Sequence, residues 1–419
     1  MKLRLAAIML LAALLLSSCS AEWKNGEVVV VQEEQKTIRI LAGQSTSDAG
    51  SEGMIQRVLE EKFPDVEFQW ICLDWGSGFA PQVTARFAAG EMPDILIGKA
   101  QDISVYKTLG AILPVPAEAC EGVCPEALSQ VMADGVLYGL PYNTLYQGVL
   151  YNKAIFDSLG LAVPATREEL ANVVSECEAA GYTPFALHFG DTWSVGNLNM
   201  QFWMNDLFAK HPVWGKKDQF RANPLVSDAF EQCRYMLEHS YSDAAQISQV
   251  ECLKRFAQGE TAMFMTGTWS MQMLYQLNPD FETGLFPYPN TTGDSCLLEE
   301  TNMTFMKGNT GKDSSLADQI LLEIGRNDVL AREIAEFSAS TSTFTSLADS
   351  ADLFMDTIGA PYAENGRIAN VALGNDQFVW PFQNLLAERT LEWLGGKISL
   401  DQILDEAETL YNFIKCTDS

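Results

Sequence analysis

The chain has 419 residues, of which 55 are Asp or Glu and 27 are Lys or Arg, so its formal net charge is −28. Hydrophobic residues make up 47% and charged residues 20%, which is typical of globular rather than disordered proteins. The acidic balance argues against nucleic-acid binding, which needs basic patches, and against charge-driven adhesion to an anionic membrane. It leaves a protein whose partner is small, neutral or cationic.

The first eighteen residues have the pattern of a secretory signal. Two basic residues precede an unbroken apolar run over 5–16, which is shorter than the roughly 20 residues needed to span a bilayer. Leu16-Ser17-Ser18-Cys19 resembles the lipobox of bacterial lipoproteins. This resemblance implies cleavage before Cys19 and a lipid on its thiol. Ordinary secretion with cleavage after Ala21 is the alternative.

Residues 19–35 follow as a polar, acidic tether in which Val28–Val31 is a candidate strand. From residue 37 the pattern alternates between strands and helices. We predict strands at 37–41, 66–71 and 95–97 and helices at 54–63 and 83–89. Pro64 and Gly90 stop these two helices. Such alternation is typical of a doubly wound, largely parallel sheet.

The alternation restarts after a turn-rich crossing at 138–142, and Pro287 and Pro289 mark a second crossing. We predict strands at 148–151, 261–265 and 301–306, helices at 167–180, 230–237 and 250–256, and a C-terminal amphipathic helix over 403–414 capped by Ser399. Two crossings favour two α/β lobes over one large sheet. The predicted lobes are 36–143 plus 287–345 and 144–286 plus 346–419.

Cysteines and histidines predict neither a metal site nor a catalytic one. Eight cysteines remain besides Cys19, and only Cys120 and Cys124 are close enough in sequence for a local disulfide staple. Cys177 and Cys233 lie in helical patterns and are expected to be buried small hydrophobes. Because the three histidines (188, 211 and 239) lack metal-ligand spacing and no G-x-S-x-G motif occurs, we expect no enzyme and no cofactor.

Six segments occur in an order known from one family. They are Phe87–Leu96, Leu109–Pro114, Asp134–Tyr142, Leu150–Lys153 with Phe156, Phe256–Met263 and Gly267–Trp269. In sequence and order they resemble the family 1 extracellular solute-binding proteins, the carbohydrate-binding components of ABC importers, to which maltose-binding protein is distantly related. The resemblance implies an α/β, bilobal periplasmic-binding-protein-like fold of type II, with two doubly wound lobes joined by hinge crossings and the ligand in the cleft between them.

The resemblance also implies a set of ligand-binding residues. Trp269 stands where the relatives have a sugar-stacking tryptophan, and Asp94 where they use a carboxylate that accepts from hydroxyls; a core tryptophan and a turn aspartate are the alternatives. Tyr142, Asn143 and Tyr146 lie in the first crossing, where packing of the hinge is the alternative. The other candidates are Gln44, Ser45, Trp75, Trp193 and Trp380.

We therefore predict a bacterial, extracytoplasmic receptor that a lipid on Cys19 holds at the cell membrane. It is expected to be a monomer that binds a mono- or oligosaccharide and delivers it to ABC permease subunits, and not to bind nucleic acid. The negative charge leaves open a cationic solute such as a polyamine. A surface glycoside hydrolase, with two carboxylates in the cleft, is the alternative from another class.

Overall fold

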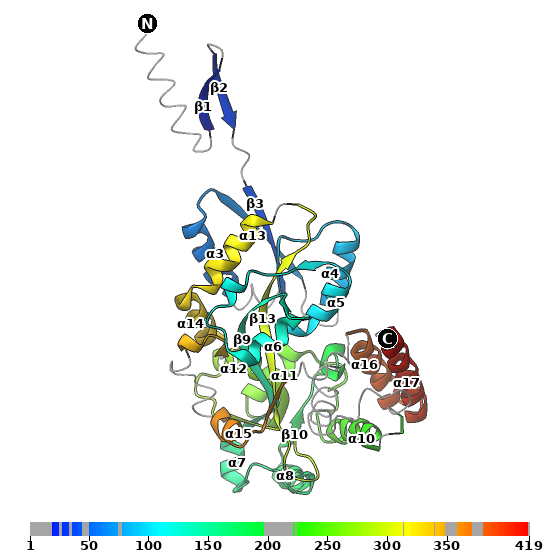
Figure 1. Cartoon of the computed structure of the whole chain (residues 1–419). Coiled ribbons are helices and arrows are strands. Elements are labelled where there is room, and N and C mark those ends of the chain that lie inside the picture. Colours follow the sequence, from blue (N-terminus) through cyan, green and yellow to red (C-terminus); the bar gives the residue numbers. More distant parts are fainter. Residues whose placement is uncertain are drawn as a thin grey trace.

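The computed structural model describes residues 19–24, 27–32, 36–43, 50–73, 78–196, 221–222, 224–312, 314–338, 340–347, 358–370 and 380–417. The predicted signal sequence lies outside these residues. The described parts form an N-terminal hairpin and an elongated body in which two α/β halves follow one another (Figure 1). Across these segments, no helix combines the length and the apolar character needed to cross a bilayer.

The predicted tether contains a β-hairpin. Strands β1 (Cys19–Lys24) and β2 (Glu27–Gln32) pair antiparallel, with Cys19 opposite Gln32. The valine run is thus a strand, as predicted, and its partner is the segment that begins at Cys19. Figure 1 shows the hairpin standing away from the body at the N-terminal end.

The first half of the body is built on three parallel strands, β3 (Lys36–Gly43), β4 (Val66–Leu73) and β5 (Ile95–Gly98). Helices α3 (Ser51–Lys62) and α4 (Phe79–Ala88) connect them, as predicted. The remaining elements of this half are η1 (Ala100–Asp102), α5 (Ile103–Thr108), β6 (Ile112–Leu113), η2 (Ala117–Cys120), α6 (Pro125–Val131), β7 (Met132–Ala133), β8 (Val136–Leu137), α13 (Ser315–Gly325), α14 (Asp328–Phe337), β14 (Thr341–Ser342) and η5 (Thr345–Leu347).

The second half is built on the parallel strands β10 (Thr183–Ala186) and β11 (Thr261–Gly267). Its other elements are α7 (Lys153–Leu159), α8 (Arg167–Ala179), α10 (Pro224–Glu238), α11 (Gln249–Ala257), η4 (Thr268–Ser270), α12 (Met271–Leu277), β12 (Thr283–Phe286), α15 (Ala360–Glu364), β15 (Ile368–Asn370), α16 (Trp380–Leu394) and α17 (Leu400–Thr417). The Ser399 hydroxyl caps α17, as predicted, because it accepts from the backbone N–H of Gln402 at 3.2 Å.

Two long antiparallel strands, β9 (Leu140–Asn152) and β13 (Leu297–Gly308), run through both halves. Through them the strands join into one hydrogen-bonded sheet with the order β10-β11-β9-β13-β5-β3-β4. The turn-rich crossing predicted at 138–142 is therefore wrong in kind, since Pro141 lies inside β9 and the strand predicted at 148–151 is its continuation. The sheet is continuous while each half keeps its own α/β character.

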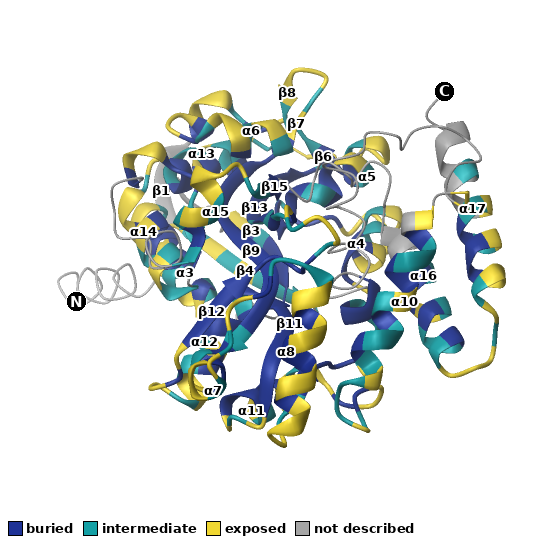
Figure 2. Cartoon of the chain, turned by 90° about the horizontal axis from the view of Figure 1, so that it is seen from below, coloured by how far each residue is buried: buried dark blue, intermediate teal, exposed yellow. Residues whose placement is uncertain are grey.

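Buried side chains nevertheless separate into groups that belong to one half each. Ile40, Tyr142 and Phe305 share a core in the first half, whereas Phe185 and Phe230 share one in the second. Figure 2 shows the buried strands at the centre and the exposed faces of the helices around them.

The passage back to the first half is made by β13. Between the predicted crossing at Pro287 and β13, the chain still packs with the second half: the Tyr288 hydroxyl donates to Gln232 in α10 at 2.8 Å, and the Asn290 carbonyl accepts from the N–H of Arg167. The strand that crosses therefore begins ten residues after Pro287, at Leu297.

Cys120, Cys124, Cys177 and Cys252 are free thiols. The local staple between Cys120 and Cys124 is thus not formed. Cys177 and Cys233 are fully buried, as predicted, and burial raises the pKa of the Cys177 thiol to about 11. These two act as small core hydrophobes.

Candidate functional site

The carboxyl ends of strands from both halves meet at the middle of the sheet. In the first half β5 ends at Gly98, which lies opposite Thr304 of β13. In the second half β11 ends at Gly267, which lies opposite Gln147 of β9. In open α/β sheets ligands bind outside the carboxyl ends of the strands, so this junction is the candidate site.

Trp269 lies in the turn that follows β11 and is partly buried. Its ring packs directly on Gly267, where a Cβ atom would come within 2.1 Å of the ring. The hydroxyl of Thr268 accepts from the backbone N–H of Tyr146 at 3.2 Å. The turn is therefore fixed to β9 on one side while the tryptophan remains partly accessible.

Trp193 lies in a short helical segment that a loop connects to β10, the strand parallel to β11, and it is also partly buried. The loop is held by Asp191, whose Oδ2 accepts from the N–H of Gln249 at 2.5 Å and lies 3.3 Å from Nδ1 of His188. The ring of His188 packs edge-on against Trp193, with 5.3 Å between the ring centroids. The position of Trp193 is thus fixed by its contact with His188, which Asp191 holds in place.

One residue connects the two tryptophan-bearing turns. The backbone N–H of Gln249, at the start of α11, donates to Asp191, and its side-chain amide donates to the hydroxyl of Ser270 at 3.3 Å. Ser270 in turn bonds the Thr266 hydroxyl at 2.7 Å. The structure therefore brings the turns of Trp193 and Trp269 together, as their shared assignment to a ligand site requires.

Burial and hydrogen bonding together set the protonation of His188 and Asp191. It lowers the pKa of His188, although the neighbouring Asp191 carboxylate works in the opposite direction. Partial burial raises the pKa of Asp191, but the hydrogen bonds from His188 and Gln249 outweigh it and lower that pKa overall. Near neutral pH the arrangement is therefore a neutral imidazole beside a carboxylate, with Nε2 of His188 lacking a hydrogen-bond partner within the described part of the chain.

The crossing residues are more deeply buried than the tryptophans. Tyr142 is 0% exposed, and its hydroxyl donates to the carbonyl of Ile324 at 3.2 Å. Asn143, 2% exposed, accepts from the N–H of Met303 at 3.0 Å and donates to Ser340 at 2.9 Å. Tyr146 is 4% exposed and belongs to a core of the second half. Such contacts are typical of residues that pack the hinge, which was the alternative to ligand binding for Tyr142, Asn143 and Tyr146.

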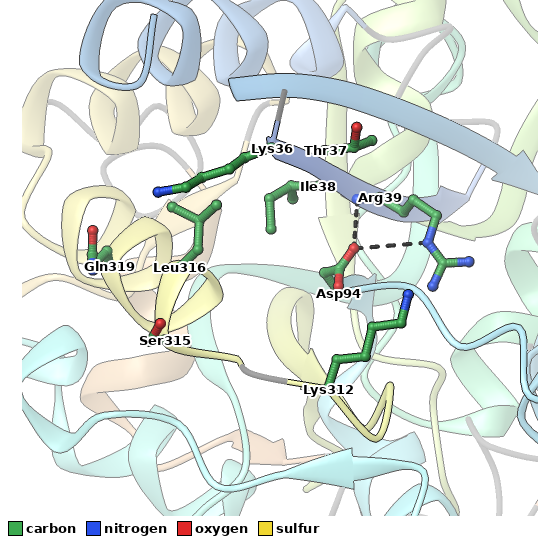
Figure 3. Close-up of a pocket in the computed structure, with 9 residues that line it drawn as sticks. All are labelled: Lys36, Thr37, Ile38, Arg39, Asp94, Lys312, Ser315, Leu316 and Gln319. Carbon is green, nitrogen blue, oxygen red and sulfur yellow. Dashed lines mark hydrogen bonds and ion pairs between the residues drawn. The ribbon is translucent and has the colours of Figure 1, made fainter. Parts of the chain in front are cut away.

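Asp94 lies elsewhere, at the amino end of β5, in a pocket of about 430 Å³ (Figure 3). It accepts from the backbone N–H of Arg39 at 2.8 Å and lies 3.8 Å from that residue's Nε. Figure 3 shows Lys312 extending towards this pair from the other wall. Since β5 separates Asp94 from the strand ends, the structure does not bring it together with the tryptophans, and its bonds are those of an aspartate that joins two strands.

Four predicted ligand residues have side chains outside the described part of the structure. Gln44, Ser45 and Trp75 lie outside the described residues. Trp380 is the first residue of α16, but its side chain is outside the description. Where side chains are described, no group of His, Cys, Asp and Glu is arranged to hold a metal ion.

The junction also contains a charged group that the sequence analysis missed. Lys99, directly after β5, forms an ion pair with Glu300 of β13, and Gln147 of β9 donates to the second Glu300 oxygen at 2.6 Å. The side chains of the ion pair are only 6% and 4% exposed. A charged residue immediately after the fully buried β5 was the available sequence signal, since buried charges are rare unless paired.

The sequence pattern of the bacterial extracellular solute-binding proteins matches residues 42–313, well over half of the chain. The chain belongs to this family. Membership implies an extracytoplasmic solute-binding protein, and the family's members are receptors rather than enzymes.

Two curated relatives are similar to this solute-binding protein over about two thirds of their own length. One is the multiple sugar-binding protein of Streptococcus mutans, 24% identical over 69% of this chain and 69% of its own. The other is the melibiose/raffinose/stachyose-binding protein MelE of Bacillus subtilis, 23% identical over 67% of this chain and 66% of its own.

Solved structures confirm the predicted fold class. The solute-binding protein RafE in complex with raffinose matches with a TM-score of 0.75 and 18% identity, over 90% of this chain and 99% of that one. A solute-binding protein of Thermotoga lettingae bound with α-D-tagatose matches with a TM-score of 0.75 and 16% identity, over 91% and 100%. The fold is the bilobal type II fold of solute-binding proteins, with β9 and β13 as its crossings.

Proposed function

We propose that this solute-binding protein is the sugar receptor of an ABC importer and takes an oligosaccharide between its halves. The observation that carries the proposal is the pair of partly buried tryptophans, Trp193 and Trp269, held together at the carboxyl ends of β10 and β11. The names of the relatives, which refer to multiple sugars and to raffinose and stachyose, support the same ligand class.

Tryptophan suits a neutral polyol because the C–H faces of a sugar ring are apolar and pack on aromatic rings. Each aromatic contact contributes about 0.5–1.5 kcal/mol beyond the burial of area. A micromolar dissociation constant corresponds to about −8.2 kcal/mol. Two stacking contacts therefore supply a minor part of the binding free energy, and area burial and hydrogen bonds to hydroxyls supply the rest.

Delivery to the permease requires the two halves to close around the solute and then release it. The only described strands that belong to both halves are β9 and β13, so closure proceeds by bending of these strands. We propose that Cys19 carries the lipid that keeps the receptor at the membrane, which its lipobox-like sequence supports.

Calorimetry on the mature chain tests the sugar assignment. Raffinose, stachyose, galactose and a chitin oligosaccharide form the panel, and spermidine represents the cationic alternative. We expect at least one sugar to bind and Trp193→Ala and Trp269→Ala to weaken it. Trp70→Phe is the matched control, because Trp70 lies in β4 of the first half and donates to Gln56. Heat from spermidine alone, or from no solute, contradicts the proposal.

Metabolic labelling with a palmitate analogue in a bacterial host tests the anchor. The full-length chain is expected to take up the label and remain with the membrane. Cys19→Ala is expected to lose the label and appear in the medium, whereas Cys72→Ala, a partly buried thiol of β4, is expected to behave as wild type. A Cys19→Ala chain that keeps the label contradicts the anchor.

A further inference from the structure

The buried group at the junction connects the end of β5 to β13 and β9 through side chains, in addition to the backbone pairing of these strands. Lys99 follows β5, Glu300 lies in β13 and Gln147 lies in β9. Both carboxylate oxygens of Glu300 are engaged, one with the Lys99 ammonium and the other with the Gln147 amide at 2.6 Å. Gln147 is 0% exposed, so the group is shielded from water. We call these three residues the junction network.

The junction network extends to the turn that carries Trp269. Gln147 lies opposite Gly267 in the β9–β11 ladder, and the ring of Trp269 packs on Gly267. The residue before Gln147 donates its N–H to the Thr268 hydroxyl at 3.2 Å. A continuous series of contacts therefore runs from the end of β5 in the first half to the tryptophan turn in the second.

The junction network also lies beside an irregularity in the crossing strands. The register between β13 and β9 shifts between Thr301 and Thr304, immediately after Glu300. At the shift, the side chain of Asn143 accepts from the N–H of Met303 in place of a regular ladder partner. Such irregularities bend strands and interrupt pairing, so this is where we expect the crossing strands to deform when the halves close.

We propose that Lys99, Glu300 and Gln147 are positioning residues for solute binding. By fixing the end of β5 to both crossing strands beside the irregularity, they hold the Trp269 turn in register with the first half. This inference rests on the proposed function. A buried ion pair is seldom needed for stability, because well-packed apolar residues of similar volume often replace it at no loss, whereas removal of one partner leaves a buried charge uncompensated.

The difference between removing one partner of the ion pair and replacing both can be tested with single and double variants. Lys99→Met and Glu300→Met are each expected to lower Tm, and the double variant to recover most of the loss. If the junction network positions the Trp269 turn, the double variant still binds the solute about tenfold more weakly than wild type. Recovery of both Tm and affinity in the double variant overturns the proposal, because the pair then has only a structural role.

Gln147→Met keeps the test decisive if the charge variants fail to fold. It leaves the ion pair intact, exposes no unpaired charge and cuts only the connection to β9. We expect weaker solute binding, again about tenfold, with a smaller loss of Tm than in the single charge variants, because one Glu300 oxygen loses its hydrogen bond while the ion pair remains. Lys62→Met is the matched control, because its ion pair with Glu323 lies wholly in the first half and is 47% and 29% exposed. Unchanged affinity in Gln147→Met overturns the proposal.

Hydrogen exchange in the ligand-free protein separates this inference from the proposed function. In the double variant and in Gln147→Met, amides of 144–147, 267–269 and 298–304 are expected to exchange faster, while those of α3 and α8 do not change. If wild type binds no sugar, the proposed function fails but the exchange experiment still applies. Unchanged exchange at the junction overturns the positioning role itself.

Discussion

The contact between Gly267 and Trp269 allows the tryptophan ring to be moved without being removed. Gly267 has φ −139° and ψ −179°, extended backbone that alanine adopts freely. The new Cβ in Gly267→Ala would stand 2.1 Å from the ring. Because carbon atoms pack at about 3.5 Å, the ring has to move by about 1.4 Å.

The displacement sets the expected loss of affinity. If the stacking contact contributes about 0.5–1.5 kcal/mol, its loss raises Kd about 2- to 13-fold. Calorimetry with a sugar that wild type binds measures Kd, and tryptophan fluorescence reports that the ring has moved. Trp269→Ala gives the limit of complete removal. Gly53→Ala is the control, because a Cβ in this helix of the first half meets no atom within 4 Å.

One combination of results contradicts a contact between Trp269 and the solute. Gly267→Ala with altered fluorescence but the wild-type Kd, together with an unchanged Kd in Trp269→Ala, means that the ring does not contact the solute. Trp269 would then be a core tryptophan, the alternative already recognised from the sequence.

Three further predictions concern His188, Tyr142 and Asp94. The pKa of His188 in the folded state is lowered from its unperturbed value of 6.5, so its stabilising effect is complete above pH 6.5 and declines as the pH falls below it. His188→Gln should therefore make Tm fall less steeply between neutral and acidic pH. An unchanged dependence of Tm on pH contradicts this prediction. Tyr142→Phe removes the bond to Ile324 and should cost about 1 kcal/mol in urea unfolding; a loss near zero means the bond contributes nothing. Asp94→Ala should lower Tm without changing solute Kd, and a parallel loss of affinity would restore its ligand role.

The helices α3 and α4 were predictable because residues that end a helix, proline and glycine, follow them in the sequence. Pro64 follows α3 closely, and Gly90, with φ 73°, follows α4. The crossing strand β9 was not, because Pro141 is normally a sign against a sheet interior. In this sheet Pro141 pairs with Thr304, at the end of the register shift, where the ladder is already irregular. Only the pairing with β13, far away in sequence, makes that proline acceptable.

The site could be predicted in part for the same reason. Trp269 comes four residues after the strand predicted at 261–265, so its place at a strand end is a local property of the sequence. Trp193 follows β10, a strand that the sequence analysis did not predict. The partnership of Lys99, Glu300 and Gln147 is not a local property, because three strands have to assemble before these side chains meet. Read locally, Glu300 is one carboxylate among 55 acidic residues, with a solvated role as the reasonable expectation.

The N-terminal hairpin changes how far an anchored receptor could move from the membrane. Seventeen extended steps from Cys19 to Lys36 would span about 60 Å. Because Cys19 lies opposite Gln32, the thirteen steps between them add only one strand spacing, and the reach falls to at most about 20 Å. The volume available to the body shrinks roughly thirtyfold, which raises its effective concentration near any partner in the same membrane by a similar factor. A hairpin of fourteen residues would thus shorten the tether between the membrane and the body.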